Sequence, residues 1–98
     1  MARTFDELVA MQRAADRARG RVAELRDEYG PPTRTPWSPS RTETYEAAWR
    51  TWRTLAEAVQ SAVTAHAAEQ GVARSQTEAD VKAAARHPGA AAETGTDG

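Results

Sequence analysis

A short proline-rich segment limits what this chain can fold into. Residues 30–39 contain four of the five prolines of the 98-residue chain, and Gly30 precedes the first of them. Proline lacks a backbone N–H and clashes with the preceding helical turn, so no helix can run through this segment. On both sides of it, apolar residues recur at helical spacing over many turns. The sequence therefore predicts two long helices joined by a stiff turn.

The first predicted helix covers residues 5–29. Thr4 and Glu7 form a T-x-x-E capping box, in which each side chain accepts a hydrogen bond from the backbone N–H of the other residue. Phe5 and Val9 widen its apolar stripe at the start. The stripe itself follows the spacing of three and four residues that is typical of coiled coils, and its members are Leu8, Met11, Ala15, Ala18, Val22, Leu25 and Tyr29.

The second predicted helix covers residues 39–70 and has two possible starts. Ser38 before Pro39 is a good N-cap, whereas Ser40 to Glu43 reads S-R-T-E and forms a second capping box. The sequence leaves the choice between these starts open. The inner stripe of this helix, together with the residues that broaden it, consists of Tyr45, Ala48, Trp49, Trp52, Leu55, Ala56, Val59, Ala62, Val63, His66, Glu69 and Gln70.

A third, shorter helix is predicted over residues 76–87. Ser75 to Glu78 reads S-x-x-E, which is a further capping box. Val81 is the only large apolar residue of this helix, so contact with the two long helices must stabilise it. We expect residues 1–88 to form a single helical domain and the small, polar segment 89–98 to be disordered.

The chain has few large apolar residues for its length: three leucines, six valines, one phenylalanine and no isoleucine. A single chain of this size usually needs disulfides, a metal or oligomerisation to be stable, and it contains no cysteine. Two antiparallel helices bury one seam, but both apolar stripes are broader than that seam. Phe5, Val9, Trp49 and Val63 would therefore remain partly exposed, and such strips usually mark a partner surface.

These observations predict an all-α fold, in which an antiparallel helical hairpin and a short C-terminal helix complete a four-helix bundle as a homodimer. The third helix could cover the exposed strip instead, but its single valine makes that the weaker solution. Asp6 and Glu7 interrupt the first residues, and no apolar run is long enough for a signal peptide or a membrane span. We expect a cytoplasmic protein that does not associate with membranes.

All three tryptophans lie close to the predicted turn, where large side chains fill the space between the helix ends. Trp37, in the TPWSPS loop, is predicted to pack as a lid over this aromatic cluster, although it could instead anchor a partner protein. The leading hypothesis is a non-enzymatic interaction or scaffold module that self-associates or binds a helical partner. The expected contact residues are Trp37, Tyr45, Trp49, Trp52, Val59 and Val63.

Few residues are suited to catalysis or metal binding. The chain has no cysteine, a single lysine and two histidines, and nucleophilic catalysis needs an activated nucleophile with a base in reach. His66 and Glu69 are three residues apart, so two copies could place them around a metal ion, but other inward carboxylates are missing. A histidine bonded to a neighbour or to water is the favoured interpretation. We expect no enzymatic activity and no cofactor or metal.

The arginines suggest an alternative function. Several of them recur at a spacing of four residues, which invites a nucleic-acid interpretation. Between residues 5 and 29, however, five arginines face six acidic residues, so this helix as a whole is not basic. A solvated face with ion pairs is favoured. A small regulatory nucleic-acid-binding protein would use Arg13, Arg17, Arg21, Arg50 and Arg53.

Overall fold

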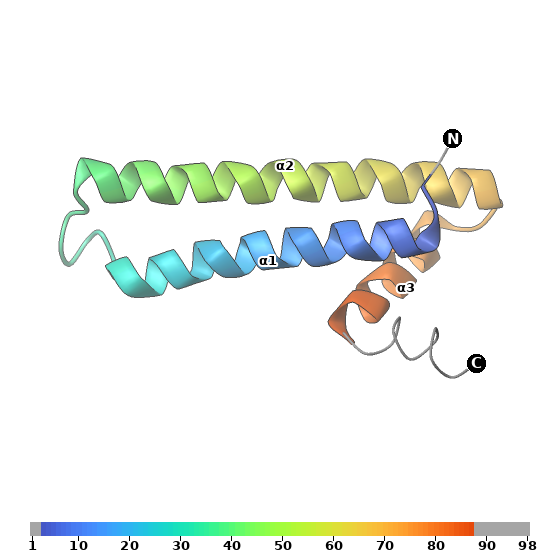
Figure 1. Cartoon of the computed structure of the whole chain (residues 1–98), viewed down its shortest axis with the longest axis horizontal. Coiled ribbons are helices and arrows are strands. Elements are labelled where there is room, and N and C mark those ends of the chain that lie inside the picture. Colours follow the sequence, from blue (N-terminus) through green and yellow to red (C-terminus); the bar gives the residue numbers. More distant parts are fainter. Residues whose placement is uncertain (1–2, 88–98) are drawn as a thin grey trace.

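The computed structural model describes residues 3–87, which fold into three α-helices (Figure 1). Helix α1 spans Phe5–Tyr29, α2 spans Pro39–Gln70 and α3 spans Arg74–Arg86. No strand occurs within residues 3–87, so the prediction of an all-helical chain is confirmed for the part that is described. The expected disordered segment 89–98 lies outside the described residues.

Helices α1 and α2 lie side by side along most of the molecule, and the loop between them closes one end (Figure 1). They run in opposite directions because this short loop joins neighbouring helix ends. Leu8, Val22 and Leu25 of α1 are buried, as are Val59 and Val63 of α2. The molecule measures 51 × 29 × 19 Å. Because it is so slender, only a narrow line of side chains can be buried.

Local capping interactions explain where the two long helices begin. The Glu7 N–H donates to Thr4 Oγ1 (3.2 Å) and the Thr4 N–H donates to Glu7 Oε1 (2.9 Å), so the predicted capping box is present. At α2 the side chain of Ser38 accepts a hydrogen bond from the Arg41 N–H (3.2 Å). Ser38 is therefore the N-cap, and Pro39 occupies the first helical turn, where its missing N–H costs nothing.

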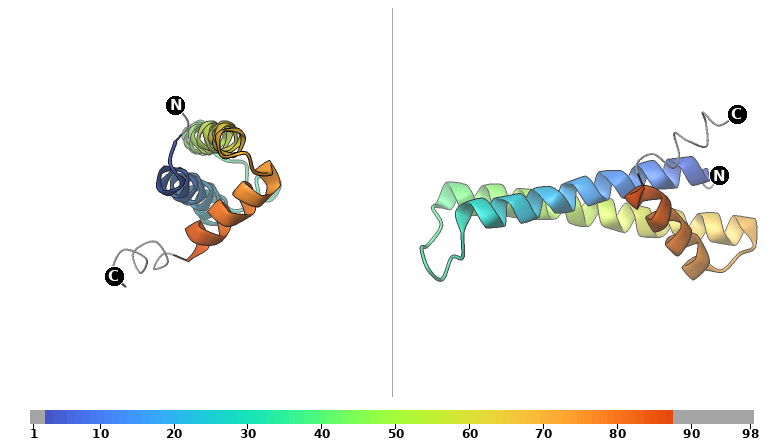
Figure 2. Two further views of the ribbon diagram at one scale, coloured as in Figure 1. Left: turned by 90° about the vertical axis from the view of Figure 1, so that its right-hand side faces the viewer. Right: turned by 90° about the horizontal axis from the view of Figure 1, so that it is seen from below.

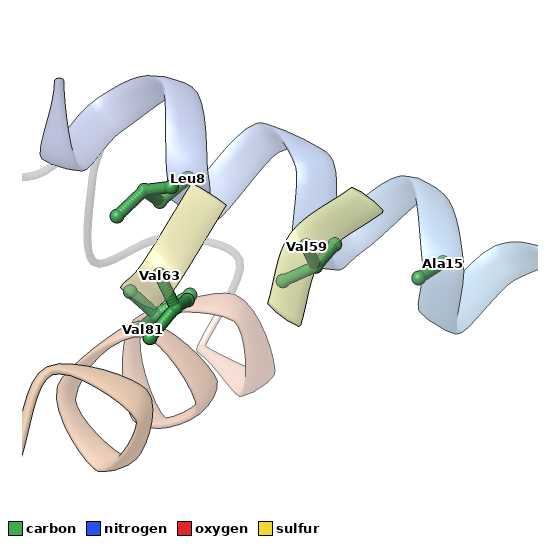
Figure 3. Close-up of a cluster of buried hydrophobic side chains, with 5 residues drawn as sticks. All are labelled: Leu8, Ala15, Val59, Val63 and Val81. Carbon is green, nitrogen blue, oxygen red and sulfur yellow. The ribbon is translucent and has the colours of Figure 1, made fainter. Parts of the chain in front are cut away.

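Helix α3 packs across α1 and α2 at the end of the molecule far from the connecting loop (Figures 1 and 2). Val81 of α3 is fully buried, and its side chain meets that of Val63 (Figure 3). Helix α3 therefore covers part of the strip, which the sequence indicated as the weaker solution. The buried residues of α3 are small and four apart, namely Thr77, Val81 and Ala85. They let α3 approach closely, so one valine is enough to fill the contact.

This contact also corrects the prediction for two residues beside the seam. Val9 and Val63 were expected to remain partly exposed, but they are 3% and 1% exposed. Phe5 and Trp49 remain exposed as predicted, at 37% and 40%. Helix α3 therefore covers Val9 and Val63 within one chain, whereas Phe5 at the start of α1 and Trp49 nearer the connecting loop stay exposed.

The start of α3 also differs from the prediction. The helix begins at Arg74, its N-cap is Ala73, and no side chain caps it. The predicted S-x-x-E box does not form, because Ser75 already lies inside the first turn. Glu78 instead lies 3.4 Å from Arg74 and 3.8 Å from Lys82 as ion pairs along the helix. At the other end His87 lies just beyond the last helical turn rather than within it.

Candidate interaction surface

The aromatic side chains near the loop form a closed cluster. The Trp37 ring lies between Tyr29 and Tyr45, with ring centroids 5.4 and 5.0 Å away and edge-on geometry. Its indole N–H donates to the Gly30 carbonyl (2.8 Å), and the Tyr45 hydroxyl accepts a hydrogen bond from Arg26 (3.0 Å). Trp37 and Tyr45 thus hold the helix ends together, which matches the interpretation of Trp37 as a lid.

Two other predicted contact residues lie inside the molecule. Val59 and Val63 are 2% and 1% exposed and belong to the core cluster with Leu8, Ala15 and Val81 (Figure 3). Helices α1 and α3 cover them, so the prediction that these two valines face a partner is wrong for this structure. Their contribution is to support the helix that carries the exposed residues.

The two remaining tryptophans lie on the uncovered part of α2. Trp49 is 40% exposed, and the Arg53 guanidinium lies 5.5 Å from its ring centroid. Arg53 also forms an ion pair with Glu57, with 3.2 Å between Nε and Oε1. Trp52 is partly buried, and Arg19 of α1 lies over its ring at 5.9 Å. These tryptophans line a shallow depression with Arg53, Ala56, Glu57, Gln60 and Ser61.

A second depression continues this surface along α2. Gln60 and Ser61 line both depressions, and Thr64 and Ala65 extend the second one away from the loop. Between them the depressions follow residues that are four apart, each next to the following one on successive turns of α2. We name this set the outer row: Trp49, Arg53, Glu57, Ser61 and Ala65, all of which are exposed.

A groove between α1 and α2 opens beside the outer row where α3 ends. Ala15 and Ala23 of α1 form one wall and Trp52 and Ala56 of α2 form the other. Lys82 and Arg86 of α3, together with Asp16 and Arg19 of α1, supply charge around it. The depression at Trp49 and this groove share Trp52, Ala56 and Gln60, so the uncovered surface extends from α1 across α2.

The five arginines of the nucleic-acid hypothesis do not form one basic surface. Arg13 donates to the carbonyls of Ala84 (3.2 Å) and His87 (3.4 Å), and so ties α1 to the end of α3. Arg53 is engaged by Trp49 and Glu57, whereas Arg50 lines a different depression with Ala47, Thr51, Thr54 and Leu55. Arg17 and Arg21 are exposed on α1. The arrangement gives the nucleic-acid hypothesis no added support.

His66 makes a local contact. Its Nδ1 lies 2.8 Å from the carbonyl oxygen of Arg3, so an N–H at Nδ1 can donate to that carbonyl and fix the start of the chain against α2. Within residues 3–87, no three or more His, Asp or Glu side chains are grouped so that they could hold a metal ion. In the same residues, no helix combines the length and apolar character that crossing a bilayer requires.

Sequence reasoning identified Trp49 and the neighbouring Trp52 as contact residues, but it did not identify the other members of the outer row as such. It assigned Arg53 to the nucleic-acid hypothesis and gave Glu57, Ser61 and Ala65 no role. Their spacing of four was visible in the sequence, but their exposure depends on where α3 packs. Comparisons with known proteins give no match: no family model, no curated protein and no solved structure is similar to this chain.

Proposed function

We propose that this chain is a small non-enzymatic interaction module that binds a helix of another chain through the exposed face of α2. One observation carries this proposal: Trp49 is 40% exposed and lines an apolar depression, in a chain that has few large apolar residues. Tryptophan is enriched among the residues that dominate binding energy at interfaces, where it fills a pocket on the partner.

The leading form of the proposal is self-association. Two hairpins of α1 and α2 that pack through this face would complete a four-helix bundle around a two-fold axis. A helix of a different protein would use the same surface. Of the residues expected to make the contact, Trp49 and Trp52 carry it, because they are the ones that neither the core nor the loop cluster encloses.

The test is the mass of the full chain by light scattering on a sizing column, over a range of concentrations. We expect a dimer that Trp49→Ala converts toward monomer, because truncating a residue that dominates the binding energy costs about 2 kcal/mol or more, about a 30-fold loss of affinity. The matched control is Val72→Ala, which truncates another exposed apolar side chain, 50% exposed, outside the depression. Circular dichroism verifies that both variants remain helical.

If the chain is monomeric at every concentration, the next test is whether it binds other proteins. The chain and its Trp49→Ala variant are then immobilised in parallel, and retention of a protein by the first but not the second supports the proposal. If Trp49→Ala changes neither the mass nor the retained proteins, the face has no binding role and the proposal is wrong.

A further inference from the structure

The outer row of α2 is complementary to a second copy of the same row that runs in the opposite direction. It begins with the bulky Trp49, continues with the positive Arg53 and the negative Glu57, and ends with the small Ser61 and Ala65. If a second row runs in the opposite direction with Arg53 opposite Glu57, then Glu57 lies opposite Arg53 and Trp49 lies opposite Ser61. In this register the charges match at the two central levels and the sizes match at the two flanking levels, and Ala65 lies beyond the paired residues.

We propose that the partner of this face is a second copy of this chain, whose α2 packs antiparallel on the outer row. The two-fold axis passes midway between Arg53 and Glu57. This inference rests on the proposed function and names the partner and its register. A contact of this kind is isologous, because the same surface serves both subunits.

The opposite orientation is disfavoured by the same residues. In a parallel pair aligned in register, Arg53 would face Arg53 and Glu57 would face Glu57, and like charges in contact are repulsive. The two Trp49 rings would also meet, which would leave the hollow beside Ser61 and Ala65 unfilled. The depression at Gln60 and Ser61 is filled when the Trp49 of an antiparallel copy lies over it.

The geometry within one chain already prepares the charged residues for this contact. Arg53 lies against the Trp49 ring and 3.2 Å from Glu57, so its guanidinium is oriented before a partner arrives. Both members of this ion pair are exposed, at 64% and 69% of their side-chain surface, and such a pair contributes little to the stability of the single chain. In the dimer the two pairs become an alternating cluster of four charges flanked by tryptophan.

The shape of the row also suits close packing. Residues four apart form a ridge on a helix surface, and such a ridge fits into the groove of a facing helix. The side of α2 that binds α3 does not obstruct this ridge. Arg74 of α3 donates to Thr64 Oγ1 (2.9 Å) and to Gln60, which leaves Ser61 and Ala65 exposed beside it.

The experiment uses two charge reversals in the full chain, Arg53→Glu and Glu57→Arg. Each variant alone would place four like charges at the axis, so we expect its dimer dissociation constant to rise about 100-fold. An equimolar mixture should recover the dimer, since the glutamates of one variant face the arginines of the other. The double variant Arg53→Glu/Glu57→Arg should dimerise like the unmodified chain. The matched control is Arg50→Glu, which reverses an exposed charge of α2 outside the row.

Light scattering and analytical ultracentrifugation give the masses, and circular dichroism verifies helicity. Recovery of the dimer in the mixture supports the inference, because an effect on the folding of each single chain would not be repaired by mixing. An unmodified chain that stays monomeric overturns it, and so do single variants that dimerise normally or a mixture that stays monomeric. In each of these cases the Trp49→Ala comparison still decides separately whether the face binds a protein.

Discussion

Replacing Val81 by alanine should release α3 from the rest of the molecule. Val81 is 0% exposed and packs against Val63 in the core cluster that also contains Leu8. The substitution removes two buried methyl groups, about 1.6 kcal/mol at roughly 0.8 kcal/mol for each group. Residual cavity around the smaller side chain adds about 1 kcal/mol, while the higher helix propensity of alanine returns about 0.6 kcal/mol. The expected net loss is about 2 kcal/mol.

A loss of stability of this size should affect α3 before the other helices. Its remaining buried side chains are the small Thr77 and Ala85, and no side chain caps its first turn. Hydrogen exchange followed by mass spectrometry compares the variant with the unmodified chain. The increase in exchange rate should be larger in residues 74–86 than in the central turns of α1. Urea unfolding gives the total loss of stability, with Val72→Ala as the exposed control. Unchanged exchange in α3, together with a loss below about 0.5 kcal/mol, would refute the role assigned to Val81.

Two further predictions concern the ends of the long helices. Trp37→Phe keeps an aromatic ring between Tyr29 and Tyr45 but removes the hydrogen bond to the Gly30 carbonyl, and should lower the free energy of unfolding by about 1 kcal/mol. Urea unfolding at low protein concentration tests this, and an equal loss in the exposed Trp49→Phe control would contradict it. At α1, hydrogen bonds from the Thr4 backbone and side chain lower the pKa of Glu7 below its ordinary value. Glu7 therefore stabilises the fold above its unfolded pKa, and this contribution is lost as pH falls through the lower folded pKa. Glu7→Gln should flatten the acid limb of the stability profile, and identical profiles would count against the capping box.

Features that depend on local chemistry could be predicted from the sequence. Thr4 and Glu7 form their capping box within one turn, Ser38 caps α2 next to Pro39, and Gly71 ends α2 with a positive φ of 68°. Each of these interactions involves residues close together in the chain, so their spacing in the sequence fixes their geometry. The choice between Ser38 and Ser40 as the N-cap of α2 needed the structure.

Features that depend on how the helices pack could not be predicted in the same way. The docking of α3 uses Thr77 and Ala85, whose small side chains give no signal in an apolar pattern although they permit close approach. The error at Val63 followed directly, because a residue beside the first seam is exposed only if no third helix covers it. The capping box expected at Ser75 also depends on packing between helices. Because α3 starts at Arg74, the Arg74 side chain reaches Thr64 and Gln60 of α2.

The lengths of the helices determine which part of α2 remains open to a partner. Helix α2 has 32 residues and α3 has 13, which at 1.5 Å per residue correspond to about 48 and 20 Å. Even if it lay parallel to α2, α3 could cover less than half of its length. Because the chain turns back at Gly71, the covered half is the one that contains Val63 and Ala67. Trp49 belongs to the other half, so no packing of α3 can bury this side chain while the connection at Gly71 stays short.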